Sequence, residues 1–182
     1  MSRDCTLRRM SEPTAPERTR TFTWDDPMVC AAAAQAMAGK DFLAAMVRGE
    51  YPRPPIANAL GFALVEVGDG TAVFEVTPAE YHYNPIGVVH GGLLATLLDS
   101  AMGCSVHSTI EQGTAYTTLE LKVNYVRPAT KSTGPLRCEG RVLHRGRRSA
   151  TAEGRVLDAA GKLYAHATTT CLVIDTRQSV GT

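Results

Sequence analysis

The sequence predicts an α+β fold in which a mostly antiparallel sheet wraps around one long central helix. Residues 93–106 form an apolar stretch of helical character whose only charge is Asp99. Two strand-like segments precede this stretch and four follow it, separated by short turn signals. A chain of 182 residues is long enough for one ordinary domain with a full core. The order helix, two strands, long helix, four strands is satisfied by a sheet packed on a single helix.

The N-terminal part of the chain is predicted to be helical after an unstructured start. Residues 1–26 carry many charges and little apolar periodicity, which favours a flexible extension. In the Ala- and Met-rich segment that follows, Asp25 or Asp26 can cap a helix and Gly39 can split it in two. The prolines of residues 51–58 predict an extended linker.

The strands are recognised by alternating polarity and by Gly-rich turns between them. Alternation places Leu119 and Leu121 on one face of the third strand, and Thr118 and Glu120 on its polar face. The long helix is expected from about residue 90 to about residue 110. The six strands are expected at residues 61–67, 71–77, 117–126, 136–143, 149–157 and 163–174.

These boundaries suggest four parts of the chain. They are a flexible extension (1–26), N-terminal helices with a linker (27–58), the main domain (59–175) and a C-terminal tail (176–182).

Composition excludes several classes of function. The net charge of +1 gives no overall field for nucleic acid, and no apolar run approaches the ~18 residues that span a bilayer. The N-terminus has no secretory signal, so we expect a cytoplasmic protein that does not act at a membrane. Five widely spaced cysteines without a CxxC pair predict reduced thiols. The histidines lack metal-ligand spacing, so no metal site is expected.

The most informative motif is His90-Gly91-Gly92, with Asp99 following nine residues after the histidine. A carboxylate on an apolar helix costs several kcal/mol unless another interaction offsets it. The first turn of a helix presents free backbone N–H groups at the positive end of the helix dipole. An anion-binding helix tip together with a carboxylate suggests acyl-transfer chemistry.

Helical geometry limits how the two halves of this motif can cooperate. Nine residues at ~100° each place His90 and Asp99 on opposite faces, ~13 Å apart along the axis. A site that uses both must therefore take one of them from a second chain. Small residues surround Asp99, and we expect substrate or a second subunit on that face. The opposite, larger face is expected to be core: Leu93, Leu94, Leu97, Ala101 and Cys104.

Residues 84–99, N-P-I-G-V-V-H-G-G-L-L-A-T-L-L-D, closely resemble the hotdog-fold thioesterases, as does N-Y-V-R-P at residues 124–128. The nearer match is the branch of phenylacetate-pathway and 4-hydroxybenzoyl-CoA thioesterases, and the resemblance extends over about residues 40–175. It implies a homodimer with shared active sites, often paired into a tetramer. It also implies hydrolysis of acyl-CoA or aryl-CoA thioesters without a metal or redox cofactor.

The resemblance also implies roles for individual residues. Asp99 matches the catalytic carboxylate, which acts as a general base on water or as a nucleophile. Gly91 matches the donor of a backbone N–H to the thioester oxygen, as in an oxyanion hole. Asn84 and His90 match polar residues close to the reacting carbonyl.

A hydroxyl group is also expected near the carboxylate. Some relatives have a threonine one turn after the carboxylate, where this chain has Gly103. Others use a serine or threonine on the next strand, which here is Thr118 or Thr117. Strand alternation places Thr118 on the polar face and Thr117 on the apolar one.

The turn that contains Arg145, Arg147 and Arg148 concentrates positive charge at a predicted hairpin. It is either a solvated turn or a clamp for the phosphates of coenzyme A, since arginine binds phosphate through two parallel hydrogen bonds. Relatives place basic residues near this hairpin for the second purpose.

Two other functions compete with hydrolysis. A hotdog enoyl-CoA hydratase would need a hydratase-type histidine motif, which the sequence lacks. A non-catalytic module that binds or senses acyl-CoA would not need the carboxylate at residue 99. The sequence therefore favours a thioesterase.

Overall fold

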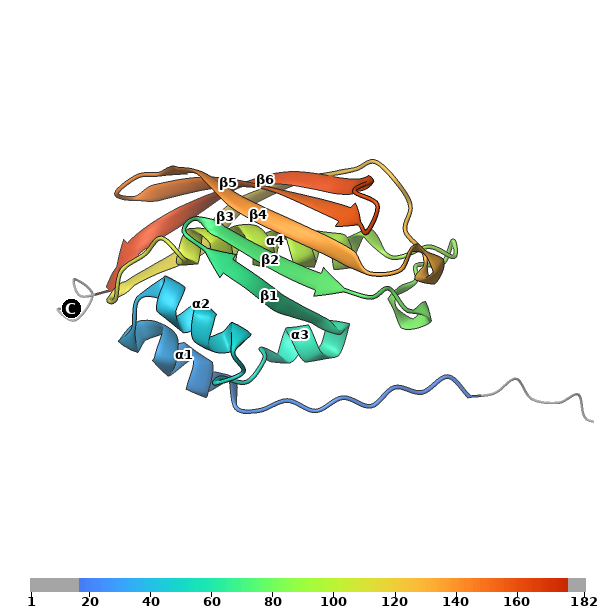
Figure 1. Cartoon of the computed structure of the whole chain (residues 1–182), viewed down its shortest axis with the longest axis horizontal. Helices are drawn as coiled ribbons and strands as arrows, with labels where there is room; N and C mark the ends of the chain where they lie inside the picture. The colour runs from blue at the N-terminus through green and yellow to red at the C-terminus, as the bar shows by residue number, and fades with distance from the viewer. Residues whose placement is uncertain (1–16, 177–182) are drawn as a thin grey trace, which may run out of the picture.

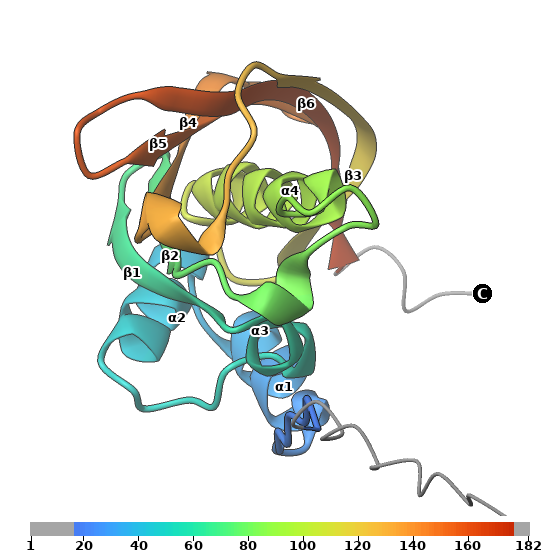
Figure 2. The ribbon, with the colours of Figure 1, turned by 90° about the vertical axis from the view of Figure 1, so that its right-hand side faces the viewer.

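A computed structural model describes residues 17–176. A six-stranded antiparallel sheet, in the order β1-β2-β4-β5-β6-β3, curves around the helix α4 (Figures 1 and 2). Residues 1–16, within the predicted extension, and 177–182, within the predicted tail, lie outside the described residues. The elements of this layer are β1 (Phe62–Gly68), β2 (Thr71–Val76), α4 (Gly91–His107), β3 (Thr114–Tyr125), β4 (Leu136–Arg145), β5 (Ser149–Asp158) and β6 (Leu163–Asp175). The predicted fold class is confirmed.

Three short helices cover the open side of the curved sheet, below α4 in Figure 2. They are α1 (Pro27–Ala36), α2 (Gly39–Val47) and α3 (Pro55–Leu60), and two single turns, η1 (Glu80–His82) and η2 (Lys131–Thr133), lie in loops. The side chain of Asp26 accepts a hydrogen bond from the N–H of Met28, so the predicted cap is confirmed. Gly39 separates α1 from α2 as expected.

Two element predictions were wrong. The Pro-rich segment is not extended throughout, because α3 begins at Pro55, where the missing N–H and the fixed φ of proline suit a first helical turn. The long helix ends at His107, before the expected residue 110, because residues 108–110 continue as turns.

Part of the segment that precedes α1 lies along α3 and η1. The guanidinium of Arg20 donates hydrogen bonds to the carbonyls of Asn58 and Ala59 and lies 4.0 Å from the ring centroid of Tyr81. Asn58 donates in turn to the carbonyl of Thr23. These contacts connect residues 20–23 to the sheet layer through α3.

The core depends on a very close approach of α4 to the sheet. Gly140 on β4 pairs directly with Gly154 on β5, and both face α4. A Cβ on Gly140 would lie 2.4 Å from the carbonyl carbon and oxygen of Ala101, which are helix backbone. The apolar side of the helix, including Leu97 and Met102, is fully buried against this surface. The lack of side chains at these two strand positions therefore determines how closely α4 packs on the sheet.

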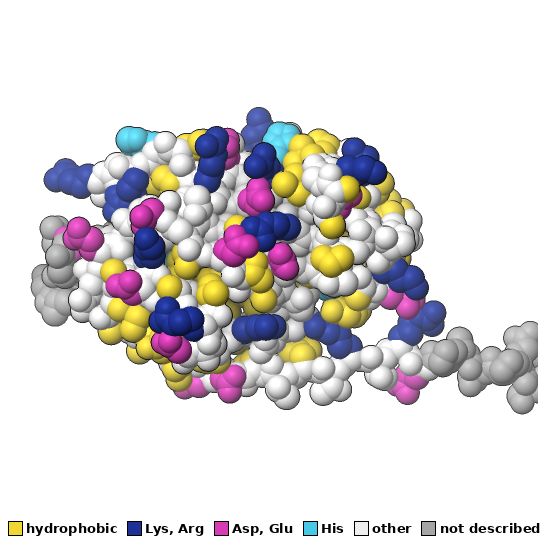
Figure 3. Space-filling model, in the orientation of Figure 1, with side chains coloured by type: hydrophobic (Ala, Val, Ile, Leu, Met, Phe, Trp, Pro, Cys, Tyr) yellow, Lys and Arg dark blue, Asp and Glu magenta, His cyan; other side chains and the backbone are white. Residues whose placement is uncertain are grey.

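The outer face of the sheet is charged and exposed. Arg137 on β4 forms ion pairs with Glu75 on the adjacent strand β2, with Glu66 on β1 beyond it, and with Glu139 on its own strand. Acidic and basic side chains intermix across this face in Figure 3. Exposed pairs of this kind contribute little to stability. Within residues 17–176, no helix has the length and apolar character needed to cross a membrane.

Replacing Gly140 with alanine should destabilise the fold by at least about 3 kcal/mol, because the added methyl group meets helix backbone that cannot move aside. The matched control is Gly154→Ala, whose methyl group would meet Met102 Cγ and Leu98 Cδ2 at 3.0 and 3.1 Å, which are side-chain atoms that can shift more easily than backbone. We expect that variant to lose about 1 kcal/mol or less. Urea unfolding measures both, and equal losses would contradict the close approach at Gly140.

Candidate active site

Asp99 projects from the middle of α4 toward β3. The hydroxyl of Thr118 donates a hydrogen bond to Asp99 Oδ1 at 3.0 Å. Both side chains are half-buried. The structure therefore brings together the predicted carboxylate and one of the two predicted threonines.

A bulge in β3 explains why Thr118 faces the helix. The pairing of β3 with β6 shifts register between Thr118 and Glu120. Leu119 and Glu120 are consequently both exposed, whereas Tyr116 and Thr118 face inward before the bulge and Leu121 after it. The alternation predicted for this strand was wrong, because it assumed an uninterrupted period of two residues. Thr117, the alternative candidate, is exposed.

Asp99 and Thr118 border a cavity of about 650 Å³ between α4, β1, β3 and the N-terminal helices. Cys104 also lines it, although we predicted that residue on the core face of the helix. Residues of the N-terminal helices contribute to the opposite wall, and the sequence alone does not fix where these helices pack on the sheet. The apolar and aromatic lining includes Phe42, Leu43, Met46, Tyr51, Phe62 and Phe74.

The cavity is closed at one end by a direct contact between α2 and the end of α4. The N–H of Gly39 donates to the carbonyl of Ile110 at 3.0 Å. A Cβ on Gly39 would lie only 1.8 Å from the carbonyl oxygen of His107, so a side chain at this position is excluded. This contact fixes Phe42 against the rings of Tyr51 and His107.

Burial keeps three ionisable side chains that line the cavity with Asp99 uncharged. Burial, with a further contribution from Asp99, raises the pKa of the Cys104 thiol to about 12. Burial also lowers the pKa of His107, so that its imidazole is neutral at pH 7, and raises the pKa of Tyr116 well above its ordinary value. No thiolate or imidazolium therefore competes with the Asp99 carboxylate inside the cavity.

The tip of α4 forms the second half of the candidate site. His90 is the N-cap, and its Nδ1 accepts the N–H of Gly92 at 2.8 Å. The N–H of Gly91 is at the first helical position, where no intrahelical partner exists, and no other partner for it is found among the described residues. The ring of Tyr125 lies against Gly91, and its hydroxyl donates to the Gly91 carbonyl at 3.1 Å.

Asn84 organises the loop that leads to this tip. Its Oδ1 accepts hydrogen bonds from the N–H groups of Ile86 and Val88 at 3.1 and 3.2 Å. A side chain that accepts bonds from its own loop is typical of a turn residue. In a single chain, Asn84 thus fixes the backbone conformation of the loop that precedes Gly91.

The two halves of the site open into different spaces in one chain. Gly91 and Tyr125 line a groove of about 400 Å³ that continues along Val126 and Pro128. Asp99 lines the larger cavity and does not border this groove. Gly91 and Asp99 are also separated by ~12 Å along the helix axis. Within a single chain, one thioester carbonyl cannot contact both residues.

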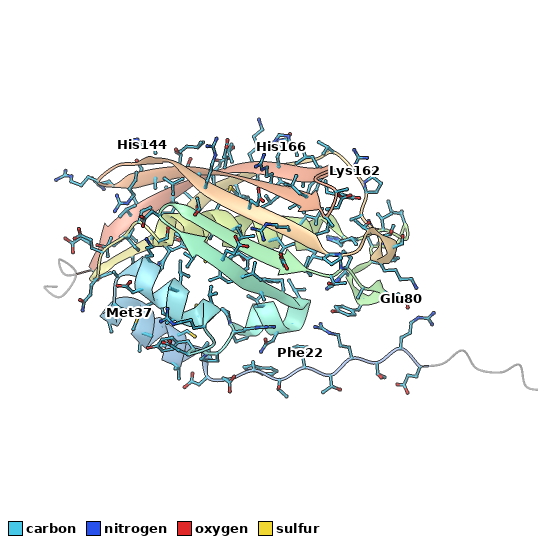
Figure 4. All side chains as sticks on the ribbon, viewed as in Figure 1. Phe22, Met37, Glu80, His144, Lys162 and His166 are labelled. Atoms are coloured by element: carbon cyan, nitrogen blue, oxygen red, sulfur yellow. The ribbon has the colours of Figure 1, made fainter. Side chains whose placement is uncertain are left out.

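The basic hairpin lies far from Gly91 in the same chain. The turn between β4 and β5 packs beside the end of β6, where the N–H of Val173 donates to the carbonyl of Arg148. In Figure 4, His144 marks this end of the molecule and Glu80 marks the opposite end, near the start of α4. Arg147 and Arg148 are exposed, whereas Arg145 is half-buried and donates to the carbonyl of Gly146.

Comparison with known proteins gives consistent matches. Residues 86–165 match the thioesterase superfamily. The chain is 33% identical to human acyl-coenzyme A thioesterase 13 over 56% of its own length and 72% of that protein. A phenylacetic acid degradation-related protein of Ralstonia eutropha JMP134 is 35% identical, with a TM-score of 0.65 over 71% of this chain and 98% of that one. The PaaI protein of E. coli, at 23% identity, has a TM-score of 0.65 over 76% and 96% of the two chains.

Proposed function

The chain belongs to the thioesterase superfamily, and on that premise we propose that Asp99 of one copy and Gly91 of another act together on an acyl-CoA thioester. The chain is a thioester hydrolase with the hotdog fold that its sequence motifs predicted. The observation that carries the proposal is the Asp99 carboxylate, which accepts a hydrogen bond from Thr118 at the edge of an apolar cavity. That cavity suits the acyl group.

In the proposed reaction, water attacks the thioester carbonyl carbon while Asp99 takes one of its protons. The new carbon–oxygen bond gives a tetrahedral oxyanion. When the carbon–sulfur bond breaks, the coenzyme A thiolate leaves and recovers the proton, and the free acid remains. Alternatively, Asp99 attacks the carbonyl directly and water then hydrolyses the resulting anhydride, with the same products.

The N–H of Gly91 is the proposed donor to the oxyanion. It is at the positive end of the α4 dipole and has no partner among the described residues. Its neighbours are held in place, since His90 caps the helix and Tyr125 packs on Gly91. A donor that needs no rearrangement during the reaction is the most effective kind, and losing one typically costs a factor of 10² to 10³ in kcat.

The division of the site between two copies is supported by the edge of the sheet. β3 is an edge strand of 12 residues in the described sheet, and it exposes Leu119 and Tyr125. A long unpaired edge with apolar side chains favours pairing with another strand. Two-fold pairing of β3 with a second β3 is antiparallel, so the Thr114 end of one copy meets the Tyr125 end of the other.

The same pairing gives the basic hairpin a function. Thr114 pairs with the last residue of β6, beside the β4–β5 turn. The hairpin of one copy is thereby directed toward the Gly91 groove of its partner, although the two lie at opposite ends of a single chain. We propose that Arg145, Arg147 and Arg148 then contact the phosphates of the coenzyme A whose thioester lies at that groove.

The first test is thiol release from a panel of aryl- and alkyl-CoA thioesters by the wild-type chain and by Asp99→Asn. We expect turnover by the wild type and a loss of kcat of about 10² or more in the variant, since the amide cannot accept the proton. Esters that bind without any turnover would favour a non-catalytic sensor instead. Wild-type rates in Asp99→Asn would remove the carboxylate from the mechanism.

The divided site is tested by mixing two inactive variants. Gly91→Pro removes the N–H while keeping a helix start, because proline is well accepted at the first helical position. Refolded together with Asp99→Asn, half of the dimers are mixed, and each mixed dimer contains one site with both groups intact. Activity should return to about a quarter of wild type. Each variant refolded alone is the control, and no recovery in the mixture would contradict the division of the site between two copies.

The phosphate clamp is tested with Arg147→Ala/Arg148→Ala. We expect KM to rise for coenzyme A esters, because the phosphates lose their hydrogen-bonding partners, while KM for truncated thioesters without phosphates stays the same. Steady-state kinetics on both substrate types give the comparison. Similar increases for the two types would exclude the clamp and leave a solvated turn.

A further inference from the structure

The inner face of β3 and one face of α4 lie side by side, and the side chains that share a face are spaced by similar distances along the two elements. Two strand residues advance about 6.7 Å, and four helix residues advance about 6 Å. Thr118 meets Asp99 at the first step, so Tyr116 is expected at Gly103 at the second. The structure shows this contact: the Tyr116 hydroxyl lies 2.8 Å from the position that a Cβ on Gly103 would take.

Gly103 therefore leaves room for a hydroxyl group that comes from the strand. The side chain of Tyr116 crosses from β3 to the helix and lies on Gly103, with the nearest ring atom 3.2 Å from the same Cβ position. Cβ positions four residues apart on a helix are about 6 Å from each other, so the hydroxyl lies one helical turn from the Asp99 side chain. Tyr116, Asp99 and Thr118 line the same cavity.

The hydroxyl of Tyr116 has no hydrogen-bond partner among the described residues, and its ring packs against His107 with centroids 5.6 Å apart. The raised pKa of Tyr116 keeps the phenol protonated at any working pH. Tyr116 lines the apolar cavity, and the oxygen of its neutral phenol retains both an acceptor and a donor. Polar groups in such surroundings usually have a partner, which indicates that the occupant of the cavity supplies it.

We infer that Tyr116 is a further catalytic residue, whose hydroxyl holds the hydrolytic water beside Asp99. The inference rests on the proposed thioester hydrolysis. One hydrogen of the water points to the Asp99 carboxylate and the other to the Tyr116 oxygen, which leaves a lone pair free to attack the carbonyl carbon. The proton still passes to Asp99, and Tyr116 gains and loses none. The same position serves whether the water attacks the thioester or an anhydride on Asp99.

The test compares Tyr116→Phe with the wild type for kcat, KM and thermal stability. The phenylalanine ring keeps the contacts with Gly103 and His107, so Tm and KM should hardly change. We expect kcat to fall by roughly tenfold to a hundredfold, the effect of losing the orientation of one reactant. Tyr164→Phe is the matched control, since it removes a hydroxyl that bonds to Asp158 away from the cavity.

A second variant restores the hydroxyl from the helix. Gly103→Ser in the Tyr116→Phe background places a hydroxyl on the helix in the space that the tyrosine oxygen leaves, and part of the lost kcat should return. Wild-type kcat in Tyr116→Phe overturns the inference and leaves the proposed function intact. A joint change of kcat, KM and Tm without recovery by the serine also overturns it, because that pattern marks a structural role. A wild-type chain that hydrolyses no ester overturns both proposals.

Discussion

The close contact between α4 and the paired glycines Gly140 and Gly154 is the constraint on which the rest of the structure depends. Because no side chain separates the backbone of Ala101 from β4, the helix cannot slide or rotate within the sheet. The proposed chemistry requires a fixed helix, since the groups that would take part in it belong to different layers. Asp99 is held by α4 and its hydroxyl neighbours by β3, so sub-ångström agreement between the layers determines whether they meet.

The sequence was sufficient to predict the architecture because its signals are local. Alternation located all six strands to within a few residues, and the isolated charge at Asp99 singled out the central helix as the candidate functional element. Simple helical geometry also predicted that His90 and Asp99 cannot serve one site within a single chain. The two separate cavities agree with that argument.

The features of the site that were not predicted depend on contacts between segments that are distant in the sequence. Hydrophobic periodicity gives no information about such contacts. Because of the bulge at Leu119, Thr118 faces the helix and not the polar side that alternation predicted. The residue type at position 119 does not indicate a bulge. Tyr116 was missed because the predicted strand began at residue 117, whereas β3 begins at Thr114. The wall formed by Phe42 and Tyr51 depends on the backbone contact of Gly39 with the end of α4, a pairing between segments that are about 70 residues apart in the sequence.

The cavity is built from two separate stretches of sequence, and this has an evolutionary consequence. The proposed catalytic residues lie within the segment that matches the superfamily, whereas Phe42, Met46 and Tyr51 precede it. Substitutions in the N-terminal helices would change the size and shape of the proposed acyl pocket without altering α4 or β3. On the proposed function, selectivity for the acyl group can therefore change while the groups proposed for hydrolysis stay the same, and the helices that cover the sheet are an exchangeable specificity element.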